Sequence, residues 1–168
     1  SSGNNLTTIY IAGHNFAMMS DRRYFLSENI RGRSGGKGKT DAQAKASGFC
    51  EAIERYSGVF QGYEITKKGS YIDMGNVAIH PDHCMLFSSE QYQTRAEWNT
   101  KCDHFQIVSE PFDETKEIEW TPLWSLTHQT WKYLPTAYCY YGYPSADKHF
   151  CIANSNGCAA GNNLEEAI

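Results

Sequence analysis

The stretch Gly35-Gly-Lys-Gly-Lys-Thr40 runs directly into Asp41-Ala-Gln-Ala-Lys-Ala-Ser-Gly-Phe-Cys-Glu-Ala-Ile-Glu-Arg-Tyr56. The glycine-rich, basic segment predicts a loop, and the residues after it predict a helix from 41 to about 60. Thr40 is a good N-cap for that helix, and Gln43 completes a capping-box pattern with it. This long helix is therefore the first fixed point of the fold.

The two sides of the predicted helix differ in chemistry. At about 100° per residue, Ser47, Glu51 and Glu54 share one stripe, with Arg55 at its edge. Glycine inside a helix costs about 1 kcal/mol relative to alanine, so Gly48 beside the carboxylates indicates that a ligand, a metal or another backbone approaches closely. The alternative is an ordinary amphipathic helix with glutamates in solvent. The opposite side is predicted to face the core; it carries Ala42, Ala46, Phe49, Ile53, Tyr56 and Phe60.

The glycine segment does not fit a phosphate-binding P-loop. That pattern requires a glycine five residues before Gly38, and the residue there is Arg33. A weaker expectation is that Arg33, Lys37 and Lys39, at the start of a helix, suit an anion.

Two motifs carry a resemblance to a known family. Gly36-Lys-Gly-Lys-Thr40 followed by Ser47-x-x-x-Glu51-x-x-Glu54-Arg55 resembles the nucleotide-binding signature of the YcaO family, and residues 154–168 resemble its second motif. The segments 119–127 and 135–142 resemble the family as well. The chain is most similar to the azoline-forming heterocyclases (cyclodehydratases) of cyanobactin-type ribosomal peptide pathways.

The resemblance implies which residues bind ATP and Mg²⁺. By motif position, Glu51 and Glu54 are magnesium ligands, and Ser47 and Arg55 belong to the same nucleotide-binding motif. Asn162 and Glu166 match the nucleotide- or metal-contacting positions of the second motif. A capping box is the alternative for Glu166, whose side chain would then bond the backbone amide of residue 163. No catalytic residue is identified in this part of the family's domain.

The resemblance also implies the reaction. An enzyme of this kind phosphorylates a backbone amide oxygen of a ribosomal peptide with ATP, and a Cys, Ser or Thr side chain closes an azoline ring. Related members make thioamides or amidines by the same activation. A non-catalytic module that binds a peptide or partner is a further alternative, because aromatic residues gather between Trp131 and Tyr143.

The resemblance further suggests that residues 1–168 are the N-terminal portion of a YcaO-like domain. The family's next Glu-x-x-Glu-Arg element would supply opposing magnesium ligands, so the fragment alone is expected to be inactive. The expected partners are a precursor peptide and a leader-peptide-binding domain or protein, and a homodimer is a further option.

Composition sets broader bounds. The chain of 168 residues is long enough for one core, and its net charge of −4 argues against an electrostatic nucleic-acid binder. No long apolar run or signal peptide is present, which favours a soluble, cytoplasmic protein with six reduced cysteines. A zinc site is disfavoured because its candidate ligands are irregularly spaced; they are His80, His83, Cys84, Cys102 and His104.

Hydrophobic patterning predicts an α+β fold with a mixed or largely antiparallel sheet. Strands are expected at residues 7–12 and, more weakly, at 76–79, and a helix at 88–98 with Ser89 as its cap. The clearest hairpin joins residues 117–126 to 131–141 through His128-Gln129, with Pro122 and Pro135 at edges or bulges.

Overall fold

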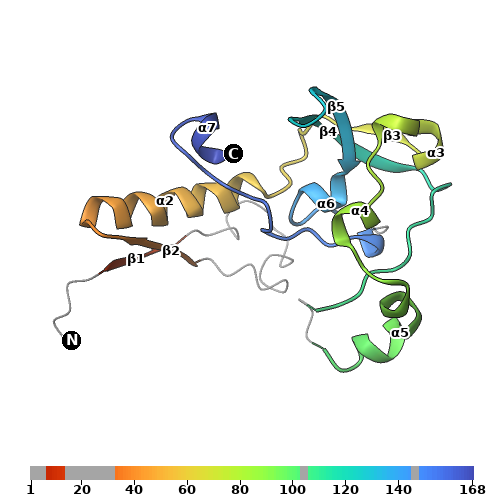
Figure 1. Ribbon diagram of the computed structural model, residues 1–168, viewed down its shortest axis with the longest axis horizontal. Coiled ribbons are helices and arrows are strands. Elements are labelled where there is room, and N and C mark those ends of the chain that lie inside the picture. Colours follow the sequence, from red (N-terminus) through yellow and green to blue (C-terminus); the bar gives the residue numbers. More distant parts are fainter. Residues whose placement is uncertain (1–6, 14–32, 103–105, 145–147) are drawn as a thin grey trace. The chain divides into compact units, whose positions relative to one another are not determined.

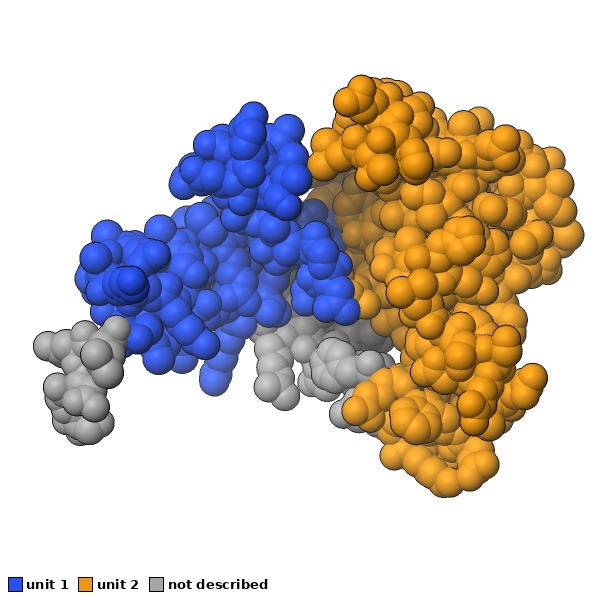
Figure 2. Space-filling view, viewed as in Figure 1, with its two compact units in different colours: residues 1–59, 155–168 blue, residues 60–154 orange. Residues whose placement is uncertain are grey.

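The computed structural model describes residues 7–13, 33–102, 106–144 and 148–168 (Figure 1). They form two compact units, coloured blue and orange in Figure 2. Unit 1 comprises residues 1–59 and 155–168, and unit 2 comprises residues 60–154.

Unit 1 is built on a two-stranded antiparallel ribbon and one long helix. Strand β1 (Thr8–Gly13) pairs with β2 (Arg33–Gly38), with Tyr10 opposite Gly36, and helix α2 (Asp41–Ser57) follows. The prediction of a strand at residues 7–12 is confirmed. The prediction of a glycine-rich loop is wrong, because those residues form β2. Glycine disfavours a strand locally, and the pairing with β1 overrides that preference.

Helix α2 begins where the sequence indicates. The Thr40 hydroxyl accepts a hydrogen bond from the backbone N–H of Gln43 at 3.2 Å, which confirms the N-cap. The Gln43 side chain accepts from the backbone N–H of Lys39 at 2.8 Å, one residue before the cap. The helix ends at Ser57, and Gly58 is its C-cap.

The side of α2 that packs is the opposite of the predicted one. Ala44 and Gly48 are buried, whereas Phe49, Ile53 and Tyr56 are 67%, 52% and 48% exposed. Ala42 and Ala46 are exposed too, and Phe60 lies in unit 2, where its ring packs edge-on against Tyr140 and Tyr143. The predicted core face is therefore wrong for the described residues.

Close backbone contact explains this inversion. A Cβ atom at Gly36 would lie 2.0 Å from the carbonyl oxygen of Ala44 and 2.2 Å from the amide nitrogen of Gly48. Strand β2 therefore fits only against the small-residue side of the helix. The sequence left open whether a ligand, a metal or another backbone approaches these small residues, and the structure shows another backbone, that of β2.

Unit 2 contains an antiparallel sheet of order β3-β4-β5, formed by Lys67–Gly69, Ile118–Ser125 and Thr130–Pro135. The predicted hairpin is confirmed, but its second strand ends at Pro135 because helix α6 (Thr136–Cys139) follows at once. Pro122 lies opposite Tyr133 of β5 but beyond residues 118–120, the part of β4 that pairs with β3. The N–H that proline lacks is therefore not needed for a bond to β3.

The other elements that the structure describes in unit 2 are helices, four of them between β3 and β4 and one after α6. They are α3 (Tyr71–Met74), η2 (Gly75–Val77), α4 (Asp82–Met85), α5 (Ser89–Asn99) and η3 (Lys148–Phe150). Helix α5 is capped by Ser88 with Gln91 in a full capping box, not by Ser89. The weak strand prediction at 76–79 reduces to one isolated bridge between Ala78 and Tyr133.

Trp120 is the centre of the core of unit 2. Its side chain is fully buried, and its indole N–H donates to the carbonyl oxygen of Gly69 at 2.8 Å, which ties β4 to β3. Met74 and Ala78 are buried beside it, and a second buried cluster contains Ala137 and Phe150. The α+β prediction with a largely antiparallel sheet is confirmed.

Candidate functional site

Glu51 is the most constrained of the predicted site residues. Its Oε2 accepts a hydrogen bond from the backbone N–H of Gly35 at 2.8 Å. Its Oε1 accepts from Arg55 Nε at 3.1 Å and lies 2.9 Å from Arg55 Nη2. The side chains of Arg55 and Glu51 are 32% and 30% exposed, so the ion pair is partly buried.

The other residues of the first motif lie beside Glu51 on the same helix. Ser47 is exposed one turn before Glu51, and Glu54 is partly buried one turn after it. Within the part of the chain that the structure describes, the Glu54 carboxylate makes no hydrogen bond or ion pair. The structure therefore places Ser47, Glu51, Glu54 and Arg55 together on α2, as the spacing predicted.

The second motif forms its own local structure. Asn163 caps helix α7 (Leu164–Ala167), and its Oδ1 accepts from the backbone N–H of Glu166 at 2.9 Å. Glu166 Oε2 accepts from the backbone N–H and the side-chain amide of Asn162, at 3.1 and 2.8 Å. The capping interaction is confirmed, although the carboxylate accepts from the backbone amide of residue 162 and not from that of residue 163. Asn162 and Glu166 thus form one hydrogen-bonded pair.

The first motif and residues 155–168 of the second motif belong to unit 1. Burial raises the pKa of the Cys158 thiol, and the Glu54 carboxylate raises the same pKa further, so this residue of the second motif lies near the end of α2. No hydrogen bond or ion pair joins the glutamates of α2 to the Asn162–Glu166 pair among the described residues.

The donor set on α2 suits Mg²⁺. Glu51 and Glu54 supply two carboxylates from one helix, and Mg²⁺ is commonly held by one or two carboxylates together with phosphate oxygens and water. The described residues contain no group of three or more His, Cys, Asp or Glu side chains that could hold a metal by themselves. Further ligands must come from the nucleotide, from water or from residues outside the described set.

Two residues that hold Glu51 or bring β2 against its helix were not found from the sequence. Gly35 was assigned only to a loop, yet its N–H holds Glu51, and Gly36 brings β2 against α2. The alternation of buried Ser34 and Gly36 with exposed residues is a strand signal, but glycine carries no hydrophobic pattern that would reveal it.

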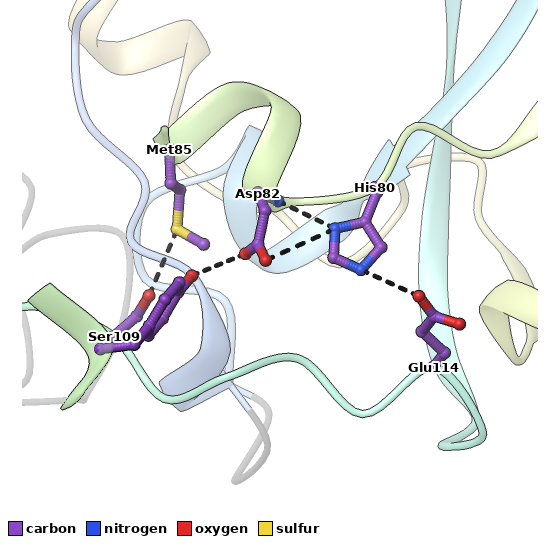
Figure 3. A network of polar contacts seen from close by, with 6 residues as sticks. His80, Asp82, Met85, Ser109 and Glu114 are labelled. Atoms are coloured by element: carbon purple, nitrogen blue, oxygen red, sulfur yellow. Dashed lines mark hydrogen bonds and ion pairs between the residues drawn. The ribbon is translucent and has the colours of Figure 1, made fainter. Parts of the chain in front are cut away.

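One residue of the disfavoured zinc cluster, His80, belongs to a network of polar contacts (Figure 3). His80 Nδ1 accepts from the backbone N–H of Asp82 at 3.2 Å, which places the ring proton on Nε2, 3.4 Å from Glu114 Oε1. The Asp82 carboxylate accepts a hydrogen bond from the Tyr92 hydroxyl at 2.6 Å. The pKa of the Tyr92 phenol is raised, mainly by burial and then by the neighbouring Asp82 carboxylate. His80 is therefore part of a structural network. His104 lies outside the described residues.

Comparison with known protein families shows which family the chain belongs to. Residues 35–168 match the family described as YcaO cyclodehydratase, ATP- and Mg²⁺-binding. The chain belongs to the YcaO family. The two motifs identified from the sequence lie inside the matched range, and ATP and Mg²⁺ are the cofactors of this family.

Two solved structures are similar to this YcaO chain. A heterocyclase in complex with substrate and cofactor is 49% identical over 100% of the chain, with a TM-score of 0.87. The heterocyclase TruD is 53% identical over 74% of the chain, with a TM-score of 0.70. The chain spans only 22% and 18% of the lengths of these two proteins. A comparison with curated proteins gave no match. None of the described helices is long and apolar enough to cross a membrane.

Proposed function

We propose that the complete gene product containing this YcaO chain activates a backbone amide of a ribosomal peptide with ATP and converts Cys, and in some substrates Ser or Thr, into an azoline. The observation that carries the proposal is the first motif, whose two carboxylates lie on one helix in a chain about half identical to known heterocyclases.

The overall chemistry balances as a dehydration. The Cys sulfur bonds to the carbonyl carbon of the preceding residue, and the amide oxygen leaves as phosphate, so that the peptide loses one water. Bound Mg-ATP supplies the phosphoryl group that makes this oxygen a leaving group. Catalysis of phosphoryl transfer depends mainly on positioning and on neutralising charge, which requires no protein nucleophile.

The proposed roles of the chain's residues follow from their chemistry. Glu51 and Glu54 hold Mg²⁺ beside the phosphates, and Ser47 and Arg55 complete this part of the nucleotide site. Asn162 and Glu166 contribute from the second motif. Among the described residues, Glu166 Oε1 has a single long bond, 3.4 Å from Asn163 Nδ2, so it retains capacity for a ligand while Oε2 accepts from Asn162.

A mass measurement on a modified peptide tests the proposal. The complete gene product, incubated with a Cys-containing precursor, ATP and Mg²⁺, is expected to reduce the peptide mass by one water for each modified Cys. An ¹⁸O label in the amide is expected to appear in the released phosphate. Gain of sulfur or nitrogen would instead assign thioamide or amidine formation. An unchanged peptide mass with intact binding would favour the non-catalytic module.

The remaining expectations belong to the same proposal. The partners are a precursor peptide and a leader-peptide-binding domain or protein, with a homodimer as a further assembly. None of the six cysteines, all of which the structure describes, forms a disulfide, which accords with the proposed cytoplasmic location. Residues 1–168 by themselves are expected to be inactive.

A further inference from the structure

The Glu51 carboxylate is held at both oxygens by groups of the chain itself. The Gly35 N–H donates a hydrogen bond to Oε2, and two nitrogens of the Arg55 guanidinium lie against Oε1. Arg55 follows Glu51 by four residues on α2, the order in which an acid and a base on a helix pair favourably. The carboxylate is therefore oriented by a strand on one side and by its own helix on the other.

The strand contact depends on two glycines that face each other. Gly36 of β2 and Gly48 of α2 lie so close that a Cβ on Gly48 would be 3.2 Å from the Gly36 nitrogen. This approach brings the neighbouring Gly35 N–H within 2.8 Å of a side chain sixteen residues later. A larger residue at either contact position would move the donor away from Glu51.

We infer that Arg55, together with the Gly35 N–H, is a positioning residue for Glu51 and acts on the metal through that carboxylate. The inference rests on the proposed function, in which Glu51 binds Mg²⁺. Arg55 Nε and Nη2 both contact Oε1 of Glu51, so two of the three guanidinium nitrogens are paired with this carboxylate. A ligand fixed in this way loses less conformational freedom when it binds a metal, and loss of such supporting groups commonly weakens metal binding by about 10- to 100-fold.

Two variants of Arg55 distinguish its role as a hydrogen-bond donor that orients Glu51 from the effect of its positive charge alone. Arg55→Met removes both the charge and the donors, whereas Arg55→Gln keeps a neutral amide donor for Glu51 Oε1. Lys45→Met is the matched control, because Lys45 pairs with Asp41 at 2.7 Å on the same helix, also at a spacing of four residues, without touching Glu51. Glu51→Gln tests the metal site itself. Circular dichroism of each variant checks that α2 is retained.

The measurement is the affinity for Mn²⁺, an octahedral oxygen-binding substitute for Mg²⁺, in the complete gene product with a non-hydrolysable ATP analogue. The signal of free Mn²⁺ in electron paramagnetic resonance gives the bound fraction. The nucleotide affinity at saturating metal is measured separately. We expect Arg55→Met to weaken Mn²⁺ binding about 10-fold or more, Arg55→Gln to weaken it less, and Lys45→Met to leave it unchanged.

Three results would overturn the inference. Unchanged Mn²⁺ affinity in Arg55→Met would show that Glu51 needs no support. Tighter Mn²⁺ binding would show that Arg55 competes with the metal. An equal loss in both Arg55 variants, confined to nucleotide affinity at saturating metal, would make Arg55 a direct phosphate ligand. Unchanged Mn²⁺ affinity in Glu51→Gln would instead refute the metal site of the proposed function.

Discussion

Replacement of Gly36 by alanine tests the packing on which the candidate site depends. The added Cβ would lie 2.0 Å from the Ala44 carbonyl oxygen, while ordinary van der Waals contact begins at 3.4 Å. The two backbones would therefore have to separate by about 1.4 Å, the difference between these distances. Neither atom belongs to a flexible side chain, so β2 and α2 must move as units.

Two costs add up in this variant. Overpacking of a tight contact costs about 1–3 kcal/mol. The Gly35 hydrogen bond to Glu51 is 2.8 Å long and would be lost at the larger separation; a bond to a charged group contributes about 1.5–3 kcal/mol, and the lower end applies because this one is exposed. We expect a total loss of about 3 kcal/mol in the free energy of unfolding.

Urea denaturation measures this loss as a lower midpoint with an unchanged slope. Gly35→Ala is the matched control, because its Cβ would meet nothing within 4 Å and its N–H is retained. We expect that control to change stability by less than about 1 kcal/mol. If Gly36→Ala were as stable as Gly35→Ala, the backbone contact between β2 and α2 would be refuted.

Three other predictions concern separate parts of the chain. Glu51→Gln and Glu54→Gln in the complete gene product should each abolish ATP-dependent phosphate release with peptide present while circular dichroism stays normal, and near-normal turnover in both would contradict their proposed role. Trp120→Ala should cost about 3–5 kcal/mol in urea denaturation because the side chain is fully buried, whereas Ile53→Ala, at 52% exposure, should cost less than about 1 kcal/mol. Glu54→Gln should also speed alkylation of Cys158 at neutral pH, because the carboxylate raises the pKa of that thiol and its removal increases the thiolate fraction; an unchanged rate would argue against their proximity.

Local sequence signals located the elements that carry the site. The Thr40 cap and the helical spacing predicted α2 and placed Ser47, Glu51 and Glu54 on one stripe, and these features depend only on residues within a few positions of one another. The hairpin of β4 and β5 was likewise predicted from its Tyr, Trp and Thr content. The two motifs were sufficient to assign the family, since a motif records residue types and spacing without reference to packing.

Only the tertiary structure decided which side of α2 packs and what holds Glu51. Hydrophobicity favoured the side with Phe49 and Ile53, but β2 is a glycine strand that offers backbone and no side chains, so it packs on the side with Ala44 and Gly48. Strand β2 itself exists because it pairs with β1, whose residues lie 20 to 30 positions earlier, a contact that no local preference encodes. The sequence determined the positions of the carboxylates on α2, and this non-local backbone contact helps to orient that of Glu51.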